Sequence, residues 1–159
     1  MIMKNKWIMA LVCVGMCALV ACKDSKKEPA TPDQPQTEDI YGNKSCPAWV
    51  VSNDYDYTTS MTAVIKVGTL NGKTIGESDI KVGDVMAAFS GDKCLGVDTL
   101  KEESIFYLYI IGAEGDVTLR YYSSHYKNIF EQEAAFPFKN DDSRGTFSDP
   151  FKTTMVVKK

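Results

Sequence analysis

Apolar and polar residues alternate along much of the second half of the chain. Between Met61 and Val67 every second residue is apolar, and Asn71-Gly72 follows as a turn signal. Residues 85–89 alternate in the same way and lead into the turn residues 90–93, after which residues 94–97 return. A period of two is typical of a half-buried β-strand, and Asn-Gly favours a hairpin turn. These segments predict two strands, the second of which enters a hairpin.

A different pattern occupies residues 105–111, where the sequence Ile-Phe-Tyr-Leu-Tyr-Ile-Ile is almost continuously apolar. Such a run predicts a strand that is either covered on both faces or has one face packed against something outside the domain. Glycine and acidic residues at 112–116 then form a turn into residues 117–121, which alternate again. The region therefore predicts two further strands.

Three shorter segments complete the predicted strands: residues 127–130, the stretch around Phe136 and Phe138, and residues 153–158. No segment of about ten residues has a helical period with capping residues. About seven to nine short strands separated by turn residues predict an all-β fold, a single antiparallel β-sandwich of the immunoglobulin-like or jelly-roll-like kind. A small antiparallel barrel is the alternative, and the strand order stays open.

The N-terminal residues 1–21 have the organisation of a secretory signal peptide. Lys4 and Lys6 precede a run of 15 uncharged residues, Trp7–Ala21. A membrane-spanning helix needs about 20 apolar residues, so this run is short for a permanent span. It ends in Leu19-Val20-Ala21-Cys22, which resembles the lipobox of bacterial lipoproteins. The resemblance implies cleavage after residue 21 and lipidation of Cys22. The alternative is an uncleaved N-terminal membrane helix.

Lipidation of Cys22 implies where the mature protein resides. Palmitate-type acyl chains contribute about 0.8 kcal/mol per buried methylene, so a Cys with two or three chains stays on a membrane. In bacterial lipoproteins generally, an Asp directly after the lipidated Cys favours retention in the inner membrane, and this chain has Lys23 there. The resemblance therefore implies the outer membrane, with either the periplasmic face or the cell surface left open.

Residues 22–44 differ in composition from the rest of the chain. They contain Pro29, Pro32 and Pro35 among polar residues, which predicts a disordered, flexible linker. The folded domain is then expected at residues 45–159, which is enough for one core. Without the signal peptide 16 basic residues face 21 acidic ones, a net charge of about −5. No nucleic acid is therefore expected as a partner.

Two cysteines, Cys46 and Cys94, lie within the predicted domain. An even number of cysteines in a small domain of an oxidising compartment predicts a disulfide, and the alternative is two buried free thiols. Together with the single histidine, His125, they do not form a cluster of metal ligands. The sequence therefore predicts no metal centre and no cofactor.

The chain shows no signature of catalysis. His125 lies in a Ser-Ser-His-Tyr turn without the Gly-x-Ser-x-Gly elbow of a hydrolase, and an exposed turn histidine is the ordinary interpretation. Residues 140–145 begin like a calcium loop, but Arg144 and Phe151 occupy positions where an EF-hand needs ligands. An acidic surface turn is favoured there over a looser calcium site at Asp141, Asp142 or Asp149. We expect a protein that is not an enzyme.

The tyrosines supply the candidate binding residues. All eight follow residue 40, and aromatic faces stack on sugar rings while nearby polar groups bond the hydroxyls. The candidates are the loop residues Tyr55, Asp56 and Tyr57 and the pair that flanks the His125 turn, Tyr122 and Tyr126. The alternative places Tyr107, Tyr109 and Tyr121 in the core and the other tyrosines over the ends of the sandwich.

A set of spaced motifs resembles a known module: Trp49, Ser60-Met61, Gly83-Asp84-Val85-Met86-Ala87-Ala88-Phe89, Gly91-Asp92-Lys93-Cys94-Leu95-Gly96, the strand at 106–111, and Asp149-Pro150. The pattern is similar to a β-sandwich module in surface lipoproteins and secreted multidomain proteins of Bacteroidetes, a module without an agreed activity. Leu95 stands where members often have Arg. The resemblance implies the fold and the location, and it transfers no binding residue.

These observations predict a lipid-anchored lipoprotein of the cell envelope that acts as a non-catalytic binding module for glycan or protein. The alternative is a structural or accessory subunit of a larger outer-membrane assembly. Exposed tyrosines beside polar groups favour ligand binding, whereas an exposed apolar face on residues 105–111 favours docking to another protein.

Overall fold

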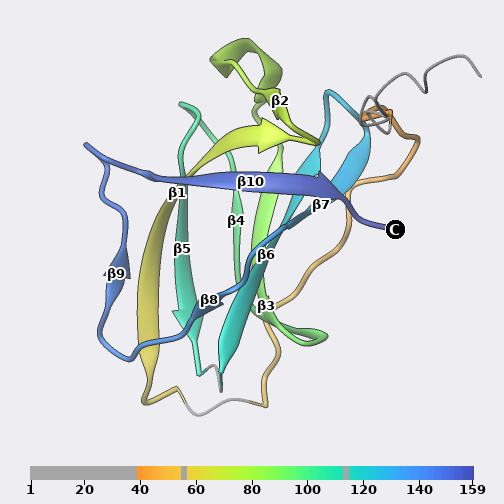
Figure 1. The fold of residues 1–159 in the computed structure, drawn as a ribbon. Coiled ribbons are helices and arrows are strands. Elements are labelled where there is room, and N and C mark those ends of the chain that lie inside the picture. Colours follow the sequence, from red (N-terminus) through yellow and green to blue (C-terminus); the bar gives the residue numbers. More distant parts are fainter. Residues whose placement is uncertain (1–38, 55–56, 113–114) are drawn as a thin grey trace, which may run out of the picture. The chain divides into compact units, whose positions relative to one another are not determined.

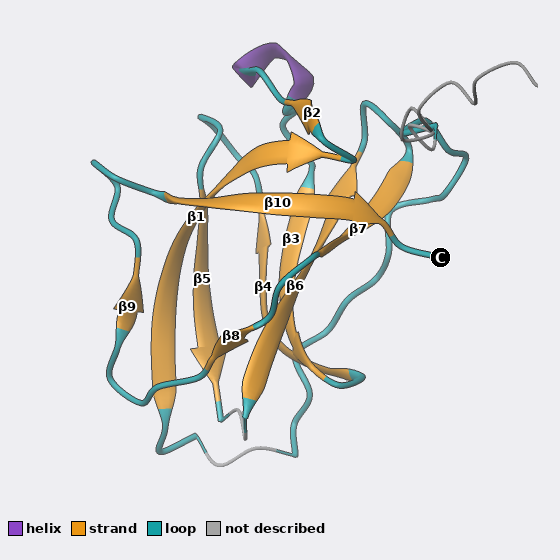
Figure 2. Ribbon diagram, in the orientation of Figure 1, coloured by secondary structure: helices purple, strands orange, loops and turns teal. Residues whose placement is uncertain are grey.

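A computed structural model of the chain describes residues 39–54, 57–112 and 115–159, which belong to one unit, Pro35–Lys159. The predicted signal peptide and Cys22 lie outside the described residues. The described part is all-β, as predicted, with a single short 3-10 turn, η1 (Glu77–Asp79) (Figures 1 and 2). The strands are β1 (Ser60–Leu70), β2 (Lys73–Thr74), β3 (Val85–Ser90), β4 (Lys93–Thr99), β5 (Phe106–Ile111), β6 (Asp116–Ser123), β7 (Asn128–Gln132), β8 (Phe136–Pro137), β9 (Ser143–Arg144) and β10 (Phe151–Val157).

The strands form one open, mixed sheet. Its order is β2-β1-β10-β7-β6-β3-β4, with β5 and β9 paired to β1 and β8 paired to β6. The pairs β1–β10 and β1–β9 are parallel and the others are antiparallel, so the expectation of a purely antiparallel fold was wrong. The two packed sheets of a sandwich are not confirmed. The parallel pairs arise because β9 and β10 return to β1 only after the chain has crossed the whole sheet.

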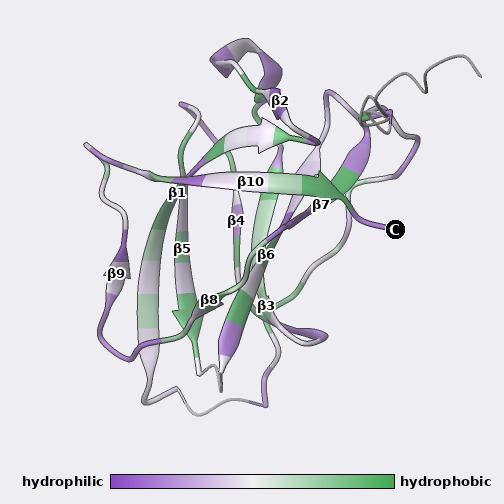
Figure 3. Ribbon diagram, in the orientation of Figure 1, coloured by the Kyte–Doolittle hydropathy of each residue, from purple (hydrophilic) through white to green (hydrophobic). Residues whose placement is uncertain are grey.

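The sheet curls around a single main core. Its buried side chains come from alternate positions of β1, β3, β5 and β6, strands on which Figure 3 shows recurrent hydrophobic residues. The largest of them, all less than 2% exposed, include Tyr121, Tyr126, Phe106, Phe130, Phe136, Ile65, Leu70, Met86, Leu95, Leu108, Ile110 and Leu119. Burial of this apolar surface is the main force that favours the curled sheet over the unfolded chain.

Both predicted hairpin turns are present. Asn71 and Gly72 have φ values of 46° and 76°, the left-handed conformation that a two-residue hairpin requires, and they connect β1 to β2. The turn at residues 91–92 connects β3 to β4, which pair antiparallel with a bulge between Ala88 and Phe89. The local turn chemistry therefore gave the correct pairing of these neighbours.

The folded part of the chain begins before residue 45. The amide of Gly42 donates to the Tyr126 carbonyl at 2.9 Å, and the amide of Lys44 donates to the Lys127 carbonyl at 2.8 Å. The last residues of the predicted linker are thus hydrogen-bonded to the turn between β6 and β7. Lys44 also bonds the Lys158 carbonyl through its ammonium group, at 2.9 Å.

Residues 46–52, which we call the strap, cross the outer face of β3 and β4. Ala87 and Phe89 point away from the main core and form a second cluster with Cys94, against which Trp49 packs. The Trp49 and Phe89 rings meet edge to face at 5.7 Å, and the Ser52 amide donates to the Cys94 carbonyl at 3.0 Å. We call this part of the outer surface the covered face.

Candidate functional site

The structure does not bring the predicted binding tyrosines together. Tyr55 and Asp56 lie outside the described residues, and Tyr57 is exposed, as predicted for a loop residue. Tyr122 and Tyr126 are only 7% and 1% exposed, so the prediction that they form a recognition surface was wrong.

Both misassigned tyrosines are held by the N-terminal segment and by neighbouring loops. The Tyr122 hydroxyl donates to the Lys44 carbonyl at 3.4 Å, and the Tyr126 ring packs edge to face on Tyr41 at 5.1 Å. The Lys73 ammonium bonds the Tyr126 hydroxyl at 3.4 Å. Burial raises the pKa of both phenols above their ordinary value. Their rings are covered by the chain itself and offer no face to a ligand.

Two further exposed tyrosines lie on β5, a strand that is buried on one face only. Phe106, Leu108 and Ile110 are fully buried, whereas Tyr107 and Tyr109 are 46% and 52% exposed. The expectation that Tyr107 and Tyr109 are core residues is therefore wrong, although Tyr121 is indeed buried. Coverage of residues 105–111 on both faces is therefore wrong, and packing of the exposed face against something outside the domain stays a prediction.

Phe147, on the loop between β9 and β10, extends this surface. Its ring stacks on Tyr107 almost in parallel, with centroids 5.9 Å apart and planes 11° apart, and 66% of Phe147 is exposed. The loop is braced internally: the Thr146 amide donates to the Asp149 carbonyl at 3.0 Å, and the Asp149 amide donates to the Thr146 hydroxyl at 3.0 Å. We call Tyr107, Tyr109 and Phe147 the aromatic row.

The backbone beneath the aromatic row is held where β4 meets β5. The Tyr107 amide donates to the Asp98 carboxylate at 2.8 Å, so a side chain replaces the carbonyl that a paired strand would supply. A Cβ atom at Gly96 would collide with the Tyr109 carbonyl oxygen, so this close approach requires glycine. The two contacts fix the strand that carries both tyrosines.

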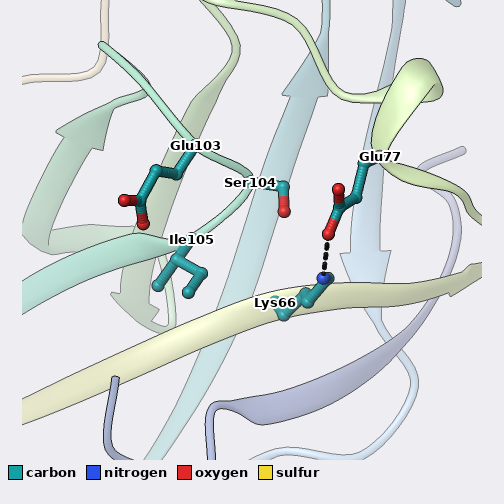
Figure 4. Close-up of a pocket in the computed structure, with 5 residues that line it drawn as sticks. All are labelled: Lys66, Glu77, Glu103, Ser104 and Ile105. Atoms are coloured by element: carbon teal, nitrogen blue, oxygen red, sulfur yellow. Dashed lines mark hydrogen bonds and ion pairs between the residues drawn. The ribbon is translucent and has the colours of Figure 1, made fainter. Parts of the chain in front are cut away.

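A pocket of about 430 Å³ opens at the start of the same strand and is lined by Lys66, Glu77, Glu103, Ser104 and Ile105 (Figure 4). We call it the polar pocket. The Lys66 ammonium and the Glu77 carboxylate form an ion pair at 2.9 Å across it. In Figure 4 the Ser104 hydroxyl lies between this pair and the Glu103 carboxylate. The pocket thus places a hydroxyl, an ammonium and two carboxylates around an apolar residue.

Asp84, named above only as part of a motif, is a buried carboxylate. It is 0% exposed and accepts hydrogen bonds from the Tyr121 hydroxyl (2.6 Å), from the Ser124 hydroxyl (2.6 Å) and amide (2.8 Å), and from the Lys81 amide (3.0 Å). Burial, followed by the charge of Asp84, raises the pKa of Tyr121 far above its ordinary value. Because its oxygens are fully engaged, Asp84 ties the start of β3 to the end of β6 and has no bond left for a ligand.

His125 contacts an acidic group but no nucleophile in the described residues. Its Nε2 atom lies 4.0 Å from the Asp79 carboxylate, and its ring packs against Tyr126. The hydroxyl of Ser124 donates to Asp84, and that of Ser123 accepts from the Tyr126 amide. A hydrogen bond from the Gly76 backbone is the largest influence that lowers the pKa of Asp79. The contact joins η1 to the turn between β6 and β7.

Both cysteines of the domain are free thiols, so the predicted disulfide is not formed in this structure. Cys46 is exposed on the strap, and the alternative of two buried thiols holds only for Cys94. Burial raises the pKa of Cys94, and its thiol donates to the Gly96 carbonyl at 3.7 Å. Cys94 therefore acts as a small packing residue of the covered face.

The acidic turn near residue 141 is occupied by local hydrogen bonds. The Ser143 amide donates to the Asp142 carboxylate at 2.9 Å, and the Asn140 side-chain amide donates to the Asp141 carboxylate at 2.9 Å. Within residues 39–54, 57–112 and 115–159, no three His, Cys, Asp or Glu side chains are grouped so that they could hold a metal ion.

Comparison of the chain with models of protein families, with curated proteins and with solved structures gave no match. In the described part of the chain, no helix has the length and apolar character required to cross a membrane.

Proposed function

We propose that this protein is a lipid-anchored lipoprotein of the outer membrane and that its domain is a non-catalytic binding module for a glycan. The observation that carries the proposal is the aromatic row, in which Tyr107, Tyr109 and Phe147 are each about half exposed or more. Large aromatic side chains that stay uncovered on a folded domain commonly mark a site of interaction.

The geometry of the row suits a sugar. Tyr107 and Phe147 stack on each other, and the parts of the pair that stay exposed offer apolar ring surface on which the C–H face of a pyranose ring can pack. The two tyrosine hydroxyls and the polar pocket next to them can exchange hydrogen bonds with the sugar hydroxyls. Because Asp98 and the braced loop hold the rings in place, little conformational entropy is lost on binding.

The anchor is proposed from the N-terminal sequence alone. Lys4, Lys6, the uncharged run to Ala21, and Cys22 have the order of a lipoprotein signal, and the proline-containing residues that follow hold the domain away from the membrane. We further propose that the domain is a variant of the β-sandwich module of Bacteroidetes lipoproteins. In support, the motif residues Trp49, Asp84 and Gly96 each have a definable structural role.

A second candidate is a structural or accessory subunit that docks on an outer-membrane assembly through the same face. Ile105 and Ile111, at either end of β5, are partly exposed on the side of Tyr107 and Tyr109. They lengthen the uncovered surface with aliphatic side chains, which favour a protein partner more than a sugar.

The proposed glycan binding is tested with a glycan array that is probed with the full chain, solubilised in a detergent without a sugar headgroup. We expect binding that falls at least about tenfold in Tyr107→Ala, because a central aromatic contact is worth 1.4 kcal/mol or more. Val50→Ala removes an exposed apolar side chain of the strap, outside the row, and is the control. Failure of the wild-type chain to bind any glycan, with a copurifying outer-membrane protein lost in Tyr107→Ala, would favour the second candidate.

The anchoring half is tested with Cys22→Ala. Without its thiol the chain cannot receive the diacylglycerol group, so we expect loss of palmitate labelling, retention of the signal peptide and release from washed membranes. Cys17→Ala, within the signal run, is the control and should label normally. Palmitate labelling that persists in Cys22→Ala contradicts the assignment.

A further inference from the structure

The polar pocket is built from three separate parts of the chain. Lys66 comes from β1, Glu77 from η1, and Glu103, Ser104 and Ile105 from the segment that enters β5. Its volume of about 430 Å³ is within the range of small-ligand sites, which is roughly 300–1,000 Å³. The proposal for the aromatic row assigns no function to this pocket.

The polar pocket and the aromatic row lie on one continuous face. Ile105 precedes Tyr107 by two residues, and side chains two apart on a strand point to the same side. Ile65 pairs with Phe106, so Lys66 on β1 lies next to Ile105 on that side. Two residues of strand span about 7 Å. A ligand that covers Tyr107 therefore reaches the polar pocket with its next ring.

The charges of the polar pocket do not cancel. Lys66 is paired with Glu77 at 2.9 Å, whereas Glu103 has no hydrogen bond or ion pair with the described residues. Glu103 also has a φ of 61°, a left-handed conformation that is uncommon for a residue other than glycine. The pocket carries one net negative charge, with a carboxylate free to accept hydrogen bonds from hydroxyl groups.

We infer that the polar pocket is a second subsite of the glycan-binding face, which accepts an uncharged sugar ring and disfavours sugars that carry a carboxylate or a sulfate. The inference rests on the proposed function. Sugar hydroxyls donate to Glu103 and accept from Lys66, whereas an acidic sugar brings a second negative charge beside Glu103. At separations of a few ångströms such repulsion is worth about 1 kcal/mol even in water.

The test measures the affinity of the full chain for neutral oligosaccharides and for uronic-acid oligosaccharides of the same linkage and length. We expect the neutral forms to bind at least about fivefold more tightly at low salt. In Glu77→Gln/Glu103→Gln the net charge of the pocket changes from −1 to +1. The preference should then disappear or reverse, because the acidic forms no longer meet a negatively charged pocket.

A matched control separates the pocket from the total charge of the protein. Glu102→Gln/Glu133→Gln removes two exposed carboxylates that do not line the pocket and should keep the preference for neutral sugars. Equal affinity of the wild-type chain for neutral and acidic forms, or an unchanged preference in Glu77→Gln/Glu103→Gln, overturns the inference. If Tyr107→Ala still abolishes binding in that case, the proposed function stands. Absence of any glycan binding overturns both.

Discussion

Two regions on the outer side of the sheet carry similar aromatic residues, but these residues are covered in one region and exposed in the other. On the covered face, Phe89 lies under Trp49 of the strap and under the guanidinium of Arg120, which is 4.0 Å from the ring centroid. On β5, Tyr107 is stacked only against Phe147, which is itself 66% exposed. The strand sequences alone do not distinguish these cases, because each strand has core residues on one side and an outward aromatic residue on the other.

Whether the outward aromatic residue is covered depends on whether another segment of the chain packs over its strand. The strap comes from residues 46–52, far from β3 in sequence, and its Trp49 is the largest side chain that covers Phe89. An unoccupied aromatic surface costs free energy because apolar area remains in water. The fold buries one such surface and leaves the other open, and the proposed binding function rests on this open surface.

The largest expected effect is at Gly96, where β4 of the covered face meets β5 of the aromatic row. Gly96→Ala places a Cβ against the Tyr109 carbonyl oxygen, so β4 and β5 must separate. We expect a loss of about 3 kcal/mol in the free energy of unfolding, at the upper end of the cost of overpacking, together with weaker glycan binding. Urea denaturation of Gly96→Ala beside Gly76→Ala, where an added Cβ would make only ordinary van der Waals contacts, checks the expectation. Equal stability of the two variants would show that β4 and β5 are not held in close contact.

The next effect is confined to the covered face. Trp49→Ala exposes Phe89 and Cys94, and we expect a loss of about 2 kcal/mol in the free energy of unfolding, because Trp49 is only partly buried. Alkylation of Cys94 should become faster, whereas glycan binding should stay within twofold of wild type. A loss of glycan affinity in Trp49→Ala as large as that in Tyr107→Ala would mean that the covered face also contributes to binding.

The aromatic row should show the reverse behaviour, with glycan affinity affected more than the stability of the fold. Tyr107→Ala removes an exposed ring, so the free energy of unfolding should fall by less than about 1 kcal/mol while the affinity for a glycan falls at least tenfold. Thermal unfolding and glycan affinity, measured on one preparation of Tyr107→Ala and one of the wild-type chain, check both expectations. A large loss of stability would mean that the aromatic row is a packing feature.

The smallest effect concerns an ion-pair network on the outer surface near Phe89. Glu131 accepts from Arg120 and from Lys158, each at 2.8 Å. Burial raises the pKa of Glu131, but the bonds from Lys158 and Arg120 outweigh it, and the pKa lies below the ordinary 4.5. The network therefore stabilises the fold above about pH 4.5 and ceases to do so as the pH falls through the lowered value.

Glu131→Gln is expected to cost about 0.5 kcal/mol at pH 7, because the group is one-third exposed and well screened. The difference from wild type should shrink as the pH falls below about 4.5 and through the lowered pKa of Glu131, which chemical denaturation at several pH values measures. Glu133→Gln, an exposed neighbour outside the network, should show no such dependence. A constant difference at every pH would mean that the charge of Glu131 is irrelevant.

The sequence predicted those features of the fold that depend on near neighbours. The alternation in residues 61–67 and 85–89, and the turns at Asn71-Gly72 and at residues 91–92, gave strands and hairpins correctly. The parallel pairing of β1 with β10 was not predicted, because it joins residues more than 80 positions apart and no local sequence pattern specifies it. The two-sheet expectation was not confirmed for the same reason.

The candidate site was only partly predictable. Tyr57 is exposed as expected, but Tyr126 is covered because residues 40–44, assigned to a linker, pair with the turn beside it. Phe147 escaped notice because its partner Tyr107 is 40 positions away. The residues of the polar pocket gave no local signal either. Their juxtaposition depends on η1 lying near the start of β5, which no periodicity encodes.

The position of β10 has a consequence for how the domain is made. This strand, Phe151–Val157, lies between β1 and β7, so the last strand of the domain to be synthesised is an interior one. Until it has emerged from the ribosome, β1 and β7 keep open edges and Met155 is missing from the core. Without β10 the hydrogen-bonded sheet is divided into two parts, one built on β1 and one that runs from β7 to β4, and this single strand joins them.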